Sequence, residues 1–131
     1  MYKRQLRHPP GLLQRTTAYF LSLGHYDALI RRTSRAYHER RKALDAAITE
    51  HGLTVAGEGA YGGSAIWMRA PGVNTTELAV ELRAKGVLIE PGAAFFASDT
   101  PPQEYYRLAY SSIPVGRIKE GVGLIADGLG P

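Results

Sequence analysis

The spacing of apolar positions predicts two helices in residues 9–52. Pro9 and Pro10 open the first helix, because proline is tolerated in a first helical turn, and Gly24 ends it. A longer helix is expected to follow and to end at Gly52. Its apolar positions recur every seven residues, as one face of a helix requires: Ile30, Tyr37 and Leu44.

The remaining residues predict four short strands and two helices. The expected strands, separated by Gly and Pro residues, are 53–56, 64–68, 87–89 and 105–111. Asn74 and Glu77 resemble a capping pair, at the start of a helix that ends at Gly86. Pro114 opens the last helix. The apolar stripe of that helix has three- and four-residue spacing: Val115, Ile118, Val122, Ile125 and Leu129.

The order α, α, β, β, α, β, β, α predicts an α+β fold. We expect a small, mostly antiparallel sheet covered by helices and preceded by a long helical segment. The composition agrees, since 131 residues with 44% apolar and 21% charged residues are ordinary for one globular domain or a piece of a larger one. The first helical part can pack on something outside this chain.

Composition also excludes several classes of protein. No apolar run approaches the roughly 18 residues of a membrane span, and no apolar stretch follows the basic start, so we expect no membrane contact and a cytoplasmic location. The absence of Cys excludes a disulfide scaffold, a thiolate zinc site and a Cys nucleophile. The net charge of +4 is weak evidence for nucleic acid, and we expect no nucleic-acid contact through this segment.

Two patterns have a functional and a plainer interpretation, and the plainer one is favoured for each. Residues 57–62 match the dinucleotide-binding pattern G-x-G-x-x-G, but a strand-like segment follows where that fingerprint needs a helix, which indicates a hairpin turn. The arginines and Lys42 of residues 31–42 do not all share one helix face, and Glu39 and Asp45 are mixed among them, which favours a solvated helix over a phosphate-binding stripe.

The histidines do not form a metal site in this interpretation. His25, His38 and His51 follow one another at intervals of 13 residues. That interval is roughly 20 Å along a helix, too far for the three rings to share one metal ion. We expect solvated histidines and no metal ligands.

Arg107 is the most informative polar residue. It lies in an apolar and aromatic strand, between Tyr106 and Leu108. An arginine there needs an anionic partner or an exit to solvent. Its planar guanidinium suits the two-point binding of a carboxylate. The alternative is an arginine on an edge strand that points outward, and residue chemistry alone leaves the two open.

Taken together, several segments resemble the C-terminal part of a fold-type I, pyridoxal-phosphate-dependent aminotransferase of class I/II. The segments are GGSAIWMRAP at 62–71, GVLIEPGAAFF at 86–96, YRLAYSSIP at 106–114 and RIKEGV at 117–122. Residues 14–21, 24–27 and the arginine-rich helix look like the segment that joins the large domain to the small one. The most similar subgroup is the aminotransferase-like part of MocR-type regulators, which carry an N-terminal winged-helix DNA-binding domain of the GntR kind.

The resemblance implies roles for two residues. Arg107 would grip the α-carboxylate of an amino-acid or 2-oxo-acid substrate, and the loop 91–96, with Phe95, resembles the segment that moves near the substrate when the small domain closes. A homodimer with its active site near the subunit interface is also implied. The Schiff-base lysine, the aspartate on the pyridine nitrogen and most phosphate ligands would belong to a large domain that precedes residue 1. The lysines Lys42, Lys85 and Lys119 have polar neighbours, and none looks desolvated enough to be a nucleophile.

These implications give a division of the chain and three hypotheses. We interpret 1–5 as a translated sequencing adapter joined to a truncated gene, with a genuine basic N-terminus as the alternative, 6–51 as a helical interdomain segment and 52–131 as the aminotransferase small domain. The first hypothesis is a fragment of an amino-acid aminotransferase that is inactive alone, with no catalytic or cofactor-binding residue of its own. The second is the effector domain of a MocR-type transcription regulator. The third is an autonomous α+β interaction domain.

Overall fold

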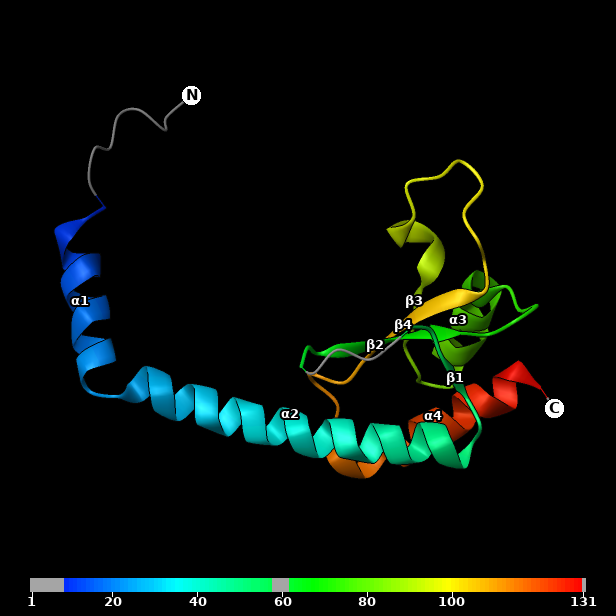
Figure 1. Cartoon of the computed structure of the whole chain (residues 1–131), viewed down its shortest axis with the longest axis horizontal. Helices are drawn as coiled ribbons and strands as arrows, with labels where there is room; N and C mark the ends of the chain where they lie inside the picture. The colour runs from blue at the N-terminus through cyan, green and yellow to red at the C-terminus, as the bar shows by residue number, and fades with distance from the viewer. Residues whose placement is uncertain (1–8, 58–61, 131) are drawn as a thin grey trace. The chain divides into compact units, whose positions relative to one another are not determined.

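The computed structural model describes residues 9–57 and 62–130, so the interpretations of 1–5 and of the centre of the 57–63 turn lie outside the described residues. The chain divides into two compact units between Ala36 and Tyr37. The first holds helix α1 (Gly11–Ser22) and the start of helix α2 (His25–Glu50), which continues into the second (Figure 1). Gly24 and Gly52 follow the two helices with positive φ angles of 72° and 64°, as the predicted helix ends require.

Nothing on α1 is buried. Large apolar side chains along residues 12–30 are at least 41% exposed: Leu12, Leu13, Tyr19, Phe20, Leu21, Leu23, Tyr26, Leu29 and Ile30. So many exposed apolar side chains in one segment are typical of an interaction surface.

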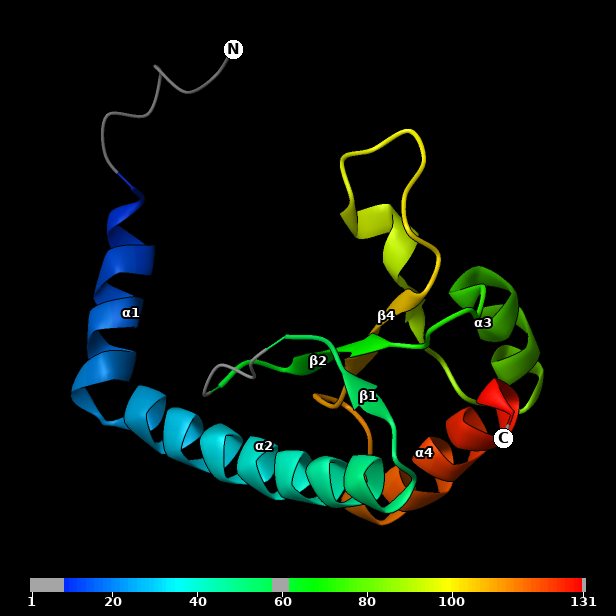
Figure 2. The same cartoon turned by 45° about the vertical axis from the view of Figure 1, so that its right-hand side comes forward.

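The second unit is a small sheet with helices against it (Figure 2). Its further elements are β1 (Thr54–Val55), β2 (Ala65–Arg69), α3 (Thr75–Ala84), β3 (Glu90–Pro91), the short 3₁₀ helix η1 (Gly92–Phe95), β4 (Tyr105–Ala109) and α4 (Val115–Leu129). The strand order is β1-β2-β4-β3, and every neighbouring pair is antiparallel. This confirms the predicted α+β fold with a small antiparallel sheet.

Alternation along the strands decides which face of the sheet is covered. Ile66 and Met68 of β2 are buried, as are Tyr106 and Leu108 of β4. The helices close the same core with side chains at helical spacing: Leu44, Ala47 and Ile48 on α2, Leu78 and Leu82 on α3, and Ile118, Val122 and Ile125 on α4. The helices therefore cover one face of the sheet, and the odd-numbered residues of β2 and β4 lie on the other face.

The strand predicted at 87–89 is wrong. The sheet instead pairs Glu90 with Arg107 and Pro91 with Tyr106. Val87 donates its backbone N–H to the carbonyl of Leu82 at 2.9 Å, which satisfies the end of α3 rather than a strand ladder. Only the ends of the apolar run pack in the core: Ile89 is buried and Val87 partly buried, while Leu88 is 70% exposed.

The predicted start of α3 is confirmed by its hydrogen bonds. The side-chain oxygen of Asn74 accepts from the N–H of Thr76 at 3.0 Å, and its amide nitrogen donates to Glu77 at 2.9 Å. The β2 strand that follows Gly62 and Gly63 confirms a strand, not a dinucleotide-binding helix, after the glycine-rich turn. Among the described residues, none of the helices combines the length and apolar composition that a membrane crossing needs.

Tyr106 gives the core a predicted dependence on pH. Its side chain is fully buried, and among the described residues its hydroxyl has no hydrogen-bond partner. Burial raises the pKa of Tyr106 to about 12, whereas an unfolded chain ionises its tyrosines near pH 10. The folded state therefore binds the proton more tightly, so its stability is complete below pH 10 and falls as the pH rises towards 12, by about 1.4 kcal/mol per pH unit.

The measurement is urea unfolding followed by the fluorescence of Trp67, the one tryptophan of the chain, between pH 9 and pH 11.5. Tyr106→Phe should remove most of this loss and leave stability at pH 8 equal or higher, because it deletes a hydroxyl that is buried without a partner. Tyr19→Phe, at a position 65% exposed, is the matched control and should behave as the unchanged chain. An alkaline loss that persists undiminished in Tyr106→Phe would disprove this account.

Candidate functional site

Three strands place a row of side chains on the face of the sheet that the helices leave free. Trp67 on β2 lies directly opposite Arg107 on β4, and Arg107 lies directly opposite Glu90 on β3. Residues directly opposite in an antiparallel pair point to the same face. The row therefore runs Trp67, Arg107, Glu90 across the sheet, on the side away from buried Leu108.

Arg107 is held by a carboxylate of its own chain. Its Nη1 donates to Oε1 of Glu90, and the two side chains are 34% and 50% exposed. Because β4 lies between β2 and β3, the edge-strand alternative for Arg107 is wrong. The guanidinium has five N–H donors, so it keeps donors for a second anion.

Aromatic rings cover the sheet beside this row. Trp67 stacks on Tyr105 with 5.9 Å between ring centroids and 9° between planes, and Phe95 meets Trp67 edge-on at 5.5 Å. Phe96 lies 5.6 Å from Tyr105. Phe95 and Phe96 remain 55% and 37% exposed, so their rings present apolar surface to solvent. We name Trp67, Glu90, Phe95, Tyr105 and Arg107 together the sheet-face site.

A close approach of two backbones positions Phe95. A Cβ added to Gly92 would lie 2.5 Å from the carbonyl oxygen of Tyr105, so only glycine lets η1 lie this close to β4. Thr75, fully buried, donates its hydroxyl to the same Tyr105 carbonyl at 2.7 Å. The Gly92 approach places the start of the 92–96 segment against β4, and the Thr75 hydrogen bond holds β4 at the same point.

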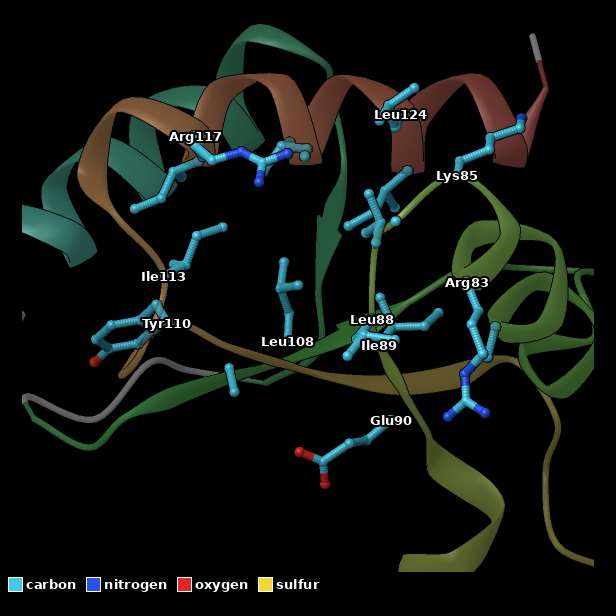
Figure 3. Close-up of a pocket in the computed structure, with 18 of the residues that line it drawn as sticks. Arg83, Lys85, Leu88, Ile89, Glu90, Leu108, Tyr110, Ile113, Arg117 and Leu124 are labelled. Carbon is cyan, nitrogen blue, oxygen red and sulfur yellow. The ribbon is translucent and has the colours of Figure 1, made fainter.

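A groove of about 830 Å³ lies on the helix side of the sheet. Residues 86–91, β4 and the helices α3 and α4 line it. Figure 3 shows Leu108 and Ile113 between β4 and α4, and Glu90 on the opposite side of β4. Four basic residues line it: Arg83, Lys85, Arg107 and Arg117. Glu90 and Arg107 also border the groove, so it adjoins the sheet-face site along β3 and β4.

The described residues do not fit pyridoxal phosphate, the cofactor that the resemblance implies. Lys42, Lys85 and Lys119 are all exposed, and none belongs to the sheet-face site. Lys119 contacts Glu50 at 2.8 Å and lowers the pKa of that carboxyl, which is the behaviour of a surface ion pair. No group of three metal-ligating side chains occurs in the ranges that the structure describes.

The basic residues of α2 are spread as expected for a solvated helix. Arg31, Arg32 and Arg35 are exposed. Arg40 donates to the carbonyl of Ser111, and Arg41 pairs with Asp45 at 2.8 Å. Arg40 and Arg41 are therefore engaged within the chain.

Of the predicted site residues, the structure places both Arg107 and Phe95 next to Trp67. Sequence reasoning missed Glu90, Trp67 and Tyr105. The available signal was weak, because Glu90 only follows an apolar run and precedes Pro91-Gly92. Recognising the three as neighbours of Arg107 needs the strand register, which the sequence does not state.

No protein-family model matches this chain. It is 57% identical over 125 residues to the HTH-type transcriptional regulator TauR of Rhodobacter capsulatus. The matched region covers 95% of this chain and 26% of that protein. This chain thus spans about a quarter of the length of that curated relative.

Solved aminotransferases share the fold. The kynurenine aminotransferase of Pyrococcus horikoshii, in complex with PMP, is 26% identical with a TM-score of 0.72, over 84% of this chain and 28% of that one. LysN, the α-aminoadipate aminotransferase of Thermus thermophilus, is 28% identical with a TM-score of 0.75, over 93% of this chain and 31% of that one. The resemblance to fold-type I aminotransferases and to a MocR-like regulator is thereby confirmed.

Proposed function

We propose that this chain is the C-terminal part of a larger aminotransferase-fold protein and that it binds the carboxylate of an amino acid or 2-oxo acid through Arg107. The observation that carries the proposal is the position of Arg107. It is a partly exposed arginine on a central strand, on the sheet face that the helices leave free, between an aromatic cluster and the half-exposed carboxylate of Glu90. In this proposal 6–51 is the interdomain segment and 52–131 the small domain.

The role of Arg107 is orientation. Two parallel N–H donors on a carboxylate fix both the position and the plane of the ligand. A ligand that is already held in one geometry loses less entropy on reaching the transition state, which lowers the barrier to reaction. Phe95, exposed beside Trp67, is proposed as a second ligand contact that excludes water from the side of the ring cluster.

The cofactor belongs to the remainder of the larger protein in this proposal. Pyridoxal phosphate supplies an electron sink for amino-group chemistry when it is bound. The lysine and ring partners that would hold it are not among the described residues, so we propose that this chain alone does not transaminate. We propose a homodimer for the full-length protein, as the resemblance implies, and a cytoplasmic location, which the absence of Cys suits.

Two whole-protein roles share this site. One is an aminotransferase, and the other is the ligand-sensing domain of a MocR-type regulator whose DNA contact lies outside this segment. The 57% identity to a transcriptional regulator, against 26% and 28% to the two enzymes, favours the regulator. Fold alone does not decide between them.

The test uses the protein encoded by the complete reading frame. A regulator should bind its own promoter DNA and change that binding when an amino acid is added, without appreciable turnover. An enzyme should convert an amino acid and a 2-oxo acid at a measurable rate and show no specific DNA binding. A protein that binds no amino acid in either assay would refute the proposal.

A further inference from the structure

We propose that Glu90 is an internal competitor for the ligand carboxylate at Arg107, and that it disfavours ligands with a second acidic group. This inference rests on the proposed function of Arg107. Glu90 is the acidic residue that contacts the Arg107 guanidinium. A ligand carboxylate must replace that contact or share the guanidinium with it.

The structure favours displacement at low cost. Glu90 and Arg107 face each other in register at the outer side of the sheet, where β3 is two residues long and residues 87–89 are not paired with β4. Glu90 is half exposed, so its carboxylate regains water when it leaves. An exposed ion pair of this kind adds little to stability, and Glu90 can therefore yield Arg107 to a ligand without disturbing the fold.

The charge of Glu90 also sets the class of ligand. If Glu90 stays beside an occupied Arg107, two carboxylates lie close together and repel, which lowers the affinity of every anionic ligand. A ligand with a second carboxylate suffers this repulsion twice. The exposed rings of Phe95 and Phe96 offer apolar surface instead. The favoured ligands are amino acids with a neutral or basic side chain, and acidic ones are disfavoured.

The other ion pair on the sheet supplies a matched control. Arg69 pairs with Glu104 at 2.9 Å, and neither residue contacts Arg107 in the described structure. Glu104→Gln removes the same charge from the same kind of pair. It should change the affinity at Arg107 less than Glu90→Gln does, since Glu104 is paired with Arg69 and does not contact the Arg107 guanidinium.

The experiment measures dissociation constants by calorimetry for L-leucine and L-glutamate on the full-length protein at 50 mM and 300 mM salt. We expect Glu90→Gln to raise the affinity for L-leucine about two- to fivefold, since exposed ion pairs have interaction energies of this size. The affinity for L-glutamate should rise by a larger factor, and both increases should be smaller at 300 mM salt than at 50 mM. Glu90→Asp keeps the charge and should tighten neither ligand as much as Glu90→Gln.

The outcomes separate this inference from the proposed function. If Arg107→Ala strongly weakens binding while Glu90→Gln tightens it, both stand. If Arg107→Ala strongly weakens binding while Glu90→Gln weakens it or leaves it unchanged, Glu90 positions Arg107 or is a bystander, and the competitor role is overturned alone. If Arg107→Ala leaves the affinity intact, the proposed function itself fails. Far-UV circular dichroism of each variant confirms that the protein is folded.

Discussion

Replacing Arg107 with alanine in the full-length protein should weaken the binding of its amino-acid ligand about 100-fold. Truncating one partner of a charge-assisted, two-point hydrogen bond costs about 2–5 kcal/mol when the pair is buried, and Arg107, at 34% exposure, belongs near the lower end. Each 1.4 kcal/mol is tenfold in affinity. In an enzyme the same loss should appear in kcat/KM, because Arg107 orients the ligand and takes no part in bond making.

Two further variants make the result specific. Arg107→Lys keeps the charge but loses the planar pair of donors, so its affinity should fall between those of the unchanged protein and Arg107→Ala. Arg117→Ala removes an arginine that is 69% exposed and pairs with Glu120 in its own helix, and it should bind the ligand normally. Equal affinities for Arg107→Ala and Arg117→Ala would remove the basis for assigning the carboxylate to Arg107.

Replacing Leu82 with alanine should lower the free energy of unfolding by about 2–5 kcal/mol. Leu82 is fully buried on the inner side of α3. It packs close to α4, where a Cβ added at Gly128 would lie 3.6 Å from its Cδ2. Removing three carbon atoms there deletes buried apolar surface and leaves a cavity between the two helices. The measurement is urea unfolding followed by Trp67 fluorescence, in which Leu82→Ala should lower the midpoint without changing the slope.

Val80→Ala is the matched control, since Val80 lies on the same helix and is 70% exposed. Its effect should stay within about 0.5 kcal/mol, the usual range for a surface substitution. If both variants lost the same stability, α3 would not pack with the face that the structure gives it.

Elements whose signals are local could be predicted from the sequence. The cap at Asn74, the helix ends at Gly24 and Gly52, and the alternation of buried side chains along β4 each depend on a few neighbouring residues. The order of helices and strands therefore follows from the sequence. The position of β3 could not be predicted, because the apolar run 87–89 does not indicate which residues pair with β4. The N–H of Val87 is instead bonded to the end of α3.

The site was predictable only in part, for the same reason. Arg107 stands out because a charged residue in an apolar strand needs an explanation. Its neighbours Trp67 and Glu90 are 40 and 17 positions away in the sequence, and only the pairing of β2, β4 and β3 places them beside it. The role of Phe95 came from resemblance, and the structure adds the contact with Trp67 that holds it.

The most direct test of the central claim is to read the genomic DNA of the source upstream of the codon for Leu6. The account predicts that the reading frame continues upstream and encodes a large aminotransferase domain with a lysine on a Ser-x-x-Lys-type stretch. A winged helix further upstream would make the protein a regulator. An in-frame stop codon directly before Met1 would contradict the account, because no cofactor-binding domain would then exist for Arg107 to serve.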